Sequence, residues 1–199
     1  MATAAKAERR APGPTTVEEL DRWDGDPGEI IDGVWVPKSP DGKVTGASFA
    51  HGIVMVTIGH LLYDYVRPRR SGVIGGAESA FLLRRAPDLV RCADVAFVSA
   101  ARVVGGIQPG AARFAPDLAV EIRSPSDRER KVAEKIRHYL GHGTRAVWDV
   151  DPDARTVVVH RPGALPRRLA GDDPLAGGDV LPGFVVPTSA LFVDLDLLP

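Results

Sequence analysis

Hydrophobic and polar positions in the first third of the chain predict a short helix, a hairpin and one long helix. Thr15 or Thr16 can cap the short helix, because glutamates follow three residues later. Residues 29–36 then alternate around an Asp-Gly pair, which is typical of a hairpin turn. From Ser48 until just before Pro68, apolar side chains recur at helical spacing.

The middle of the chain predicts strands. Residues 73–83 and 90–98 are rich in apolar and branched side chains, and a Pro-Asp pair joins them. Residues 115–126 begin as a further apolar run, which indicates a buried strand that ends at Ser124 and Pro125. We interpret these segments as three central strands.

A second helix is predicted over residues 127–140, opened by a capping box of Ser126 and Glu129. Its apolar stripe lies about 60° from Lys135, so the stem of that lysine can be buried while its amine reaches the edge of a cleft. Two strands, residues 146–150 and 156–160, follow as another hairpin.

These elements predict an α/β or α+β fold with a mixed central sheet flanked by helices, preceded by an N-terminal helix and hairpin. The Ala-rich opening, residues 1–14, is expected to be a disordered tail. Residues 15–199 are expected to form a single domain, because their number suits one hydrophobic core.

Composition narrows the classes of protein that fit. The net charge is −1, so any site for a polyanion must be a local patch. The single cysteine, Cys92, excludes an internal disulfide framework and favours a cytoplasmic protein. The longest apolar runs are shorter than a membrane span, so no membrane partner is expected.

Acidic residues in the predicted strands are the strongest indication of chemistry. Asp117, Glu121 and Arg123 share one face of the strand in residues 115–126, and Asp94 lies within another apolar strand. Buried charges are costly unless they are paired or bind a metal. Glu121 could simply pair with Arg123, and Asp94 could cap a backbone group at a strand end.

If these acids converge, a divalent cation would relieve their repulsion. Ligands that are all oxygen favour Mg²⁺ or Mn²⁺ over zinc. A metal with carboxylates and a nearby cation suits phosphodiester hydrolysis.

The acid at Asp94 followed by Glu121-Ile122-Arg123 resembles the PD-(D/E)xK nuclease pattern. More narrowly, the chain resembles the Uma-type family of bacterial restriction endonucleases. The matching segments follow one another over nearly the whole chain after the tail: residues 16–20, 29–33, 93–98, 115–126, 134–139, 147–152 and 178–184.

This resemblance implies a restriction-endonuclease-like fold and a metal site at Asp94 and Glu121, with Asp117 nearby. It also implies that Glu29 is an outer ligand, and Glu78 is a weaker candidate. The cofactor that it implies is Mg²⁺ or Mn²⁺.

The chain departs from the family pattern at one position: Arg123 stands where the family carries a strand lysine. Arginine does not readily release a proton. We therefore predict that Lys135 orients the attacking water and that Arg123 holds the substrate phosphate.

The first hypothesis is a Mg²⁺-dependent DNA endonuclease, with DNA as partner and a homodimer as a compatible assembly. The alternative is a catalytically weak nucleic-acid-binding or interaction module that keeps the nuclease fold. A third is a structural subunit whose acids form salt bridges only. His51 and His60 are nine residues apart on the long helix, so they do not share a face and are interpreted as polar edge residues.

Overall fold

The computed structural model describes residues 13–38, 48–77, 79–124 and 128–197. Residues 1–12 of the predicted tail lie outside this part of the chain. The last two residues of that predicted tail, Gly13 and Pro14, lie inside it, and Pro14 is buried. The predicted tail therefore overlaps the described fold by these two residues.

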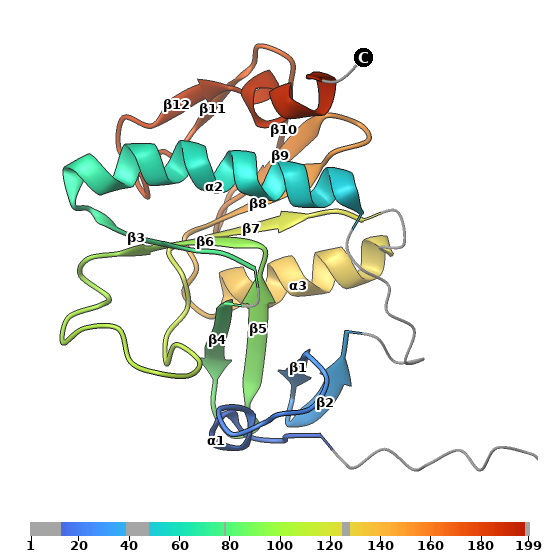
Figure 1. Ribbon diagram of the computed structural model, residues 1–199, viewed down its shortest axis with the longest axis vertical. Helices are drawn as coiled ribbons and strands as arrows, with labels where there is room; N and C mark the ends of the chain where they lie inside the picture. Colours follow the sequence, from blue (N-terminus) through green and yellow to red (C-terminus); the bar gives the residue numbers. More distant parts are fainter. Residues whose placement is uncertain (1–12, 39–47, 78, 125–127, 198–199) are drawn as a thin grey trace, which may run out of the picture.

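The described residues form three helices, two short 3-10 helices and three β-sheets (Figure 1). The helices are α1 (Val17–Leu20), α2 (Phe49–Arg69) and α3 (Glu129–Gly141), and the 3-10 helices are Thr188–Leu191 and Val193–Asp196. The four-stranded sheet has the order β2 (Val34–Pro37), β1 (Gly28–Ile31), β5 (Leu89–Ala93), β4 (Ser79–Arg84). The six-stranded sheet has the order β10 (Arg167–Ala170), β9 (Thr156–His160), β8 (Ala146–Asp151), β7 (Leu118–Ile122), β6 (Val95–Ser99), β3 (Gly72–Gly75). The remaining pair is β11 (Pro174–Ala176) with β12 (Val185–Pro187).

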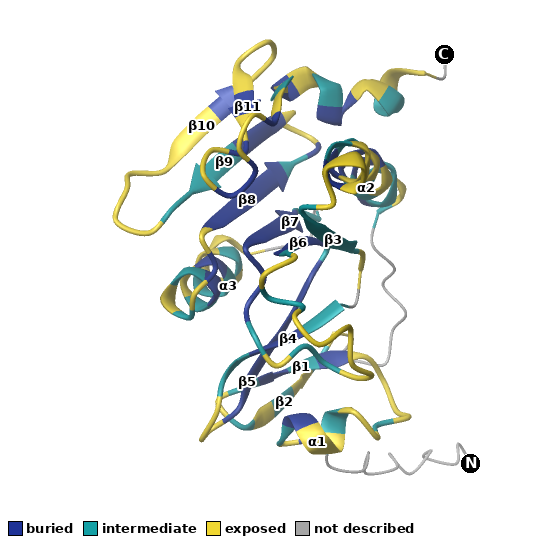
Figure 2. Cartoon of the chain, turned by 90° about the vertical axis from the view of Figure 1, so that its left-hand side faces the viewer, coloured by how far each residue is buried: buried dark blue, intermediate teal, exposed yellow. Residues whose placement is uncertain are grey.

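Helices α2 and α3 lie on opposite faces of the six-stranded sheet (Figure 2). Strands β7 and β8 are parallel and are linked through α3, whereas β6 and β9 flank them in antiparallel pairs. The sheet is therefore mixed, as predicted, because a helical crossover sits among hairpins. Leu118, Val120 and Ile122 of β7 pack into the core with α2, and Ala119 packs toward α3.

The N-terminal elements confirm the predicted helix and hairpin. Thr16 caps α1, and its side chain and that of Glu19 form the reciprocal capping box. Asp32 and Gly33 both have positive φ, 52° and 76°, as the turn between β1 and β2 requires. Of the side chains in α1, only Val17 is fully buried.

The two predicted strands over residues 73–83 and 90–98 are each divided, so those predictions were wrong in length. Strands β3 and β4 replace the first, and they belong to different sheets. Strands β5 and β6 replace the second, with Asp94 between them. At Asp94 the chain leaves the four-stranded sheet and enters the six-stranded sheet, so this residue joins the two sheets.

Helix α2 continues through Pro68 to Arg69, although the sequence predicted an end before the proline. Proline removes only one hydrogen bond in this last turn, and Arg70 then ends the helix in the left-handed conformation. At 21 residues, α2 is long and apolar enough to cross a membrane by length and composition alone, a test that the core helix of a soluble protein can also pass. Its buried side chains belong to the core beneath the six-stranded sheet.

Helix α3 begins at Glu129, two residues later than predicted, and Arg128 is its N-cap without a capping side chain. The predicted capping box involves Ser126, which lies outside the described residues; its other member, Glu129, binds Arg123. The hairpin of β8 and β9 confirms the predicted strands at residues 146–150 and 156–160.

Candidate active site

Asp94 and Glu121 are brought side by side by the pairing of β6 with β7. The register pairs Val95 with Val120, so Asp94, just before β6, comes opposite Glu121, and its charge acts on Glu121. The backbone N–H of Asp94 donates to the Val120 carbonyl at 3.2 Å. One carboxylate oxygen of Asp94, Oδ2, accepts the N–H of Ile122 at 2.8 Å. Asp94 thus caps the neighbouring strand and keeps Oδ1 on the side of the site.

Glu121 is a buried carboxylate whose two oxygens differ in their contacts. Its Oε2 accepts a hydrogen bond from Lys135 Nζ at 2.6 Å. Its Oε1 is buried and accepts no well-formed hydrogen bond from the described residues, although the buried Tyr139 hydroxyl lies close to this carboxylate. Burial raises the pKa of Glu121 to about 7, and the charges of Asp94 and Glu29 act in the same direction.

Lys135 reaches the site from α3 and lies among carboxylates. Besides Glu121, its Nζ donates to the Cys92 carbonyl at 3.0 Å and lies 3.6 Å from Glu29 Oε1. Burial alone would lower the pKa of Lys135, but the charges of Glu121, Glu29 and Asp94 raise it well above its usual value. The lysine is therefore a fixed positive charge in the site.

Glu29 enters from β1 of the four-stranded sheet and is held by Arg91 of β5. Glu29 Oε2 accepts from Arg91 Nη1 at 2.7 Å, and Oε1 accepts the N–H of Cys92 at 2.9 Å. Although burial would raise the pKa of Glu29, the charges of Lys135 and Arg91 hold it below its usual value. Glu29 is thus an ionised carboxylate whose oxygens are already engaged.

Arg91 is a site residue that the sequence analysis missed. Only 4% of it is exposed, and it also contacts Glu134 Oε1 at 3.1 Å and His138 Nδ1 at 3.0 Å. A guanidinium so deeply buried must be paired to remain charged. The available signal was a cation in the middle of the apolar run in residues 89–93.

His51 is the second missed residue, because the sequence analysis placed it at a polar edge. It is buried in the first turn of α2, and its Nε2 lies 3.5 Å from Asp94 Oδ1. Its Nδ1 lies 3.5 Å from Ser124 Oγ. Although burial would raise the pKa of Asp94, His51, Lys135 and the Ile122 N–H together lower it.

Asp117 does not join the cluster, which corrects the prediction that it lies near the metal site. It precedes β7, so about 13 Å of strand separates it from Glu121. Its carboxylate accepts the Ser99 N–H at 2.8 Å and Arg102 Nε at 3.0 Å. These bonds make Asp117 a structural anchor at the other end of the strand.

Arg123 also contacts other groups than the sequence analysis predicted. Its guanidinium binds Asp149 through two bonds of 2.7 Å and also binds Glu129. Its donors are therefore held by two carboxylates of the protein, and Glu121 pairs with Lys135 rather than with Arg123. Glu78, the weaker candidate, lies outside the described residues.

The donor set fits a hard divalent cation that keeps part of its water shell. Asp94 and Glu121 are adjacent, and Glu121 Oε1 is a buried oxygen that accepts no well-formed hydrogen bond in the described part of the chain. Among the described residues, no three His, Cys, Asp or Glu side chains form a ready-made metal cage. Mg²⁺ commonly binds through one or two carboxylates and several waters, so two ligands suffice for it.

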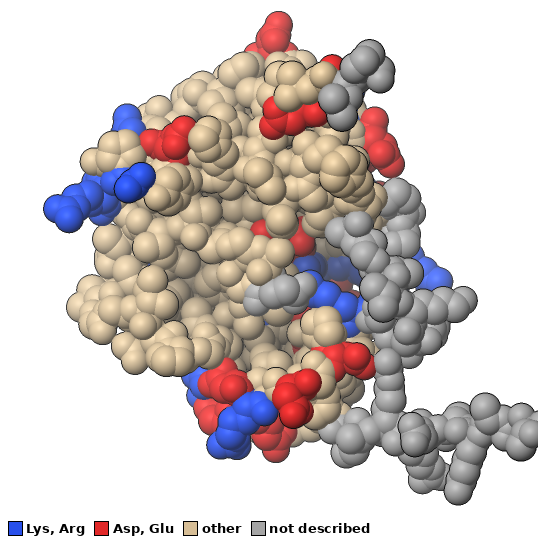
Figure 3. Space-filling model, viewed as in Figure 1, with Lys and Arg blue, Asp and Glu red and all other residues tan. Residues whose placement is uncertain are grey.

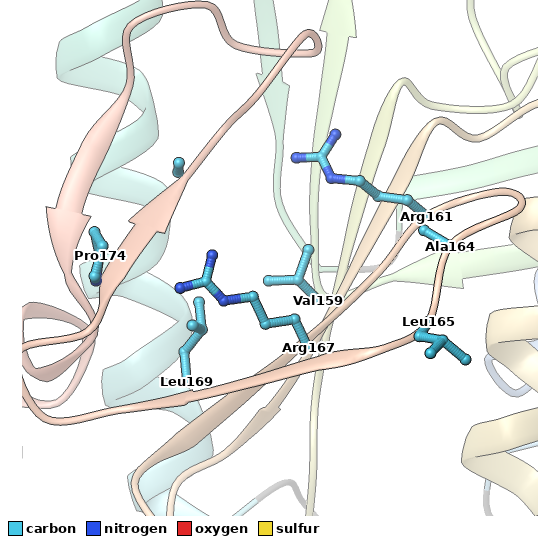
Figure 4. Close-up of a pocket in the computed structure, with 8 residues that line it drawn as sticks. Val159, Arg161, Ala164, Leu165, Arg167, Leu169 and Pro174 are labelled. Atoms are coloured by element: carbon cyan, nitrogen blue, oxygen red, sulfur yellow. The ribbon is translucent and has the colours of Figure 1, made fainter.

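A separate surface pocket lies between β9, β10 and β11 (Figure 4). It contains the side chains of Val159, Arg161 and Arg167, and none of the carboxylates described above. Arg161 is paired there with Asp179 at 2.8 Å. This pocket is therefore distinct from the carboxylate cluster.

Comparisons with known proteins agree with this fold. A search of curated proteins finds no match. Among solved structures, the chain is similar to a protein from Anabaena variabilis ATCC 29413, described as "a putative nuclease belonging to DUF820". The two share 23% identity with a TM-score of 0.76, over 90% of this chain and 98% of the other. A family model described as "Uma2: Putative restriction endonuclease" matches residues 17–190, and the chain therefore belongs to the Uma2 family.

Proposed function

We propose that this protein is a metal-dependent endonuclease that hydrolyses phosphodiester bonds of DNA. The observation that carries the proposal is the buried Oε1 of Glu121, which accepts no well-formed hydrogen bond from the described residues and lies near the charge of Asp94. A buried carboxylate oxygen without a partner costs free energy, which a bound cation would recover. Asp94 and Glu121 would hold Mg²⁺ or Mn²⁺, and Glu29 supports them through Lys135.

A bound divalent cation would supply a Lewis acid and lower the pKa of a water at the scissile phosphate. The hydrolysis adds the water oxygen to phosphorus, breaks one P–O ester bond and gives a proton to the leaving oxygen. Lys135 places its charge 2.6 Å from Glu121, where it can orient that water and offset negative charge in the transition state. In this proposal, Lys135 takes the role of the lysine that the family carries on the strand.

Cleavage of plasmid and linear DNA with Mg²⁺ or Mn²⁺ tests the proposal. We expect Glu121→Gln and Asp94→Asn each to lower the rate by about a hundredfold or more. Asp64→Asn is the matched control, because Asp64 is 62% exposed and contacts His60 rather than the site. Equal rates in Glu121→Gln and the wild type would contradict the proposal.

Metal binding gives a second measurement that does not depend on cleavage. A ligand that binds only the folded state raises the melting temperature by mass action. Mn²⁺ should therefore stabilise the wild type and Asp64→Asn, and it should not stabilise Glu121→Gln. An unchanged Mn²⁺ effect in Glu121→Gln would remove Glu121 from the metal site.

One observation favours a second candidate, a nucleic-acid-binding module with little catalysis. Arg123 occupies the position of the family's strand lysine, and Asp149 and Glu129 hold its guanidinium. If Lys135 does not replace that lysine, the site lacks its catalytic cation. This candidate predicts DNA binding without cleavage in either metal, on single-stranded and double-stranded DNA alike.

A further inference from the structure

Helix α3 carries a row of cations that leads out of the candidate site. Arg128, Lys131 and Lys135 are spaced by three and four residues, so they lie along one side of the helix. Lys135 contacts Glu121 inside the site, whereas Arg128 and Lys131 are exposed. No carboxylate in the described part of the chain pairs with Arg128 or Lys131. We call Arg128 and Lys131 the basic row.

The acids of α3, by contrast, are used within the protein. Glu129 binds Arg123, and Glu134 binds Arg91. Both acids therefore neutralise Arg123 and Arg91, and neither is bonded to the basic row in the part of the chain that the structure describes. Lysine and arginine side chains gather beside α3, on the side where its N-terminal end lies (Figure 3).

The position of the basic row is unfavourable for the helix itself. The N-terminal end of a helix carries partial positive charge and favours acids, so cations there cost stability. Arg128 is the N-cap without a capping hydrogen bond, and Arg130 and Lys131 follow in the first turn. Of these cations, Arg128 and Lys131 share a side of the helix with Lys135, so a ligand at the site could offset their cost.

We propose that the basic row binds backbone phosphates of the DNA strand whose scissile phosphate lies at Glu121 and Lys135. The proposal rests on the proposed endonuclease function and names the residues that position its substrate. Seven residues of helix span about 10 Å, the axial length of about three phosphates of one strand in duplex DNA. With a net charge of −1, the whole protein offers no general attraction, so a local row is needed.

Helix α3 provides its own matched control. Arg130 and Arg137 are exposed like the basic row. They are seven positions apart, so they lie on one side of the helix, and that side faces away from Lys135. The test compares Arg128→Ala/Lys131→Ala with Arg130→Ala/Arg137→Ala, which remove the same charge from the same helix. Binding of a fluorescent DNA duplex is measured by anisotropy in EDTA, where no cleavage occurs, over a range of salt concentrations.

We expect the Arg128→Ala/Lys131→Ala variant to bind DNA about tenfold or more weakly, with the log–log salt slope reduced by about two. The control variant should stay within about threefold of the wild type. Because cations are lost from the positive end of the helix, the melting temperature of Arg128→Ala/Lys131→Ala should rise or stay equal. A purely structural role would instead lower the melting temperature and leave binding unchanged.

Equal losses of binding in the two double variants, or none in either, would overturn the proposal. Binding of duplex RNA more than about tenfold tighter than duplex DNA would overturn the assignment to DNA. If the wild type cleaves DNA but Arg128→Ala/Lys131→Ala binds normally, the basic row is wrong and the endonuclease stands. If the wild type never cleaves but that variant alone loses binding, the endonuclease is wrong and the basic row stands.

Discussion

Lys135 Nζ lies 2.6 Å from Glu121 Oε2, although one residue belongs to α3 and the other to β7. Helix α3, which connects β7 to β8, thus places a lysine beside β7, the strand that precedes the helix. Arg123, only two residues after Glu121 in the chain, turns instead to Asp149 on β8. The cation of the site is therefore supplied by the helix and not by the strand.

Replacing Lys135 should separate catalysis from binding. Lys135→Ala removes the charge beside Glu121, so we expect cleavage to fall by about a hundredfold or more. DNA binding should change by less than about threefold, because the basic row remains. Anisotropy and plasmid cleavage measure the two effects, with Arg137→Ala as a control on the exposed side of α3. Full activity in Lys135→Ala would return the catalytic role to Arg123.

Arg123→Ala should lower stability more than DNA binding, contrary to the expectation that Arg123 grips phosphate. It would leave Asp149, only 3% exposed, as a buried carboxylate without its main partner. The expected loss is about 3 kcal/mol in the free energy of unfolding. A double-mutant cycle with Asp149→Ala in urea should give a coupling of about 1–3 kcal/mol. No coupling, together with a large loss of DNA binding, would restore the phosphate role.

Tyr139→Phe should be neutral or stabilising. The Tyr139 hydroxyl is fully buried and makes no well-formed hydrogen bond in the described part of the chain, although it lies close to Glu121. Burial and the nearby charges of Glu121 and Glu29 raise the pKa of Tyr139 well above its usual value. Removing it should raise the free energy of unfolding by about 1 kcal/mol, because an unsatisfied buried group is removed without changing the packing. Urea denaturation measures this. A loss of stability would indicate that the hydroxyl bonds to Glu121 in solution.

Asp117 should contribute stability that disappears in acid. Burial would raise its pKa, but the Ser99 N–H and Arg102 hold the pKa of Asp117 below its usual value of 3.8. Its contribution is therefore present above that value and is lost as the pH falls through the lowered pKa. Asp117→Asn should cost about 2 kcal/mol at pH 7, and the difference from the wild type should shrink below pH 3.8. A constant difference at all pH values would contradict this.

The sequence was sufficient to predict the pairing of Asp94 with Glu121 and the approach of Lys135. Acids within apolar strands stand out by the cost of burying them. The helical angle of Lys135 from its apolar stripe indicates where its amine emerges. The acids within apolar runs and the helical angle of Lys135 are both local features, and local features of the sequence are kept in the folded structure.

The rest of the site depends on distances between residues, and the periodicity of the sequence does not predict these distances. Strand alternation places Asp117 and Glu121 on one face, but the four positions from one to the other correspond to about 13 Å of strand, which keeps their carboxylates apart. Arg91 and His51 join the site only because β1, β5 and α2 converge there. The division of the strand at Asp94 was invisible for the same reason, since each half pairs with a different sheet.

Because the chain changes sheet at Asp94, the site lies at the junction of the four-stranded and six-stranded sheets. Glu29 and Arg91 belong to the four-stranded sheet, and Glu121 belongs to the six-stranded sheet. A chain trimmed past β1 would keep the larger sheet, yet Arg91 would lose a carboxylate and Lys135 would lose one of its counter-charges. The short N-terminal hairpin, which contributes little to the main core, therefore helps to set the charge balance of the carboxylate cluster.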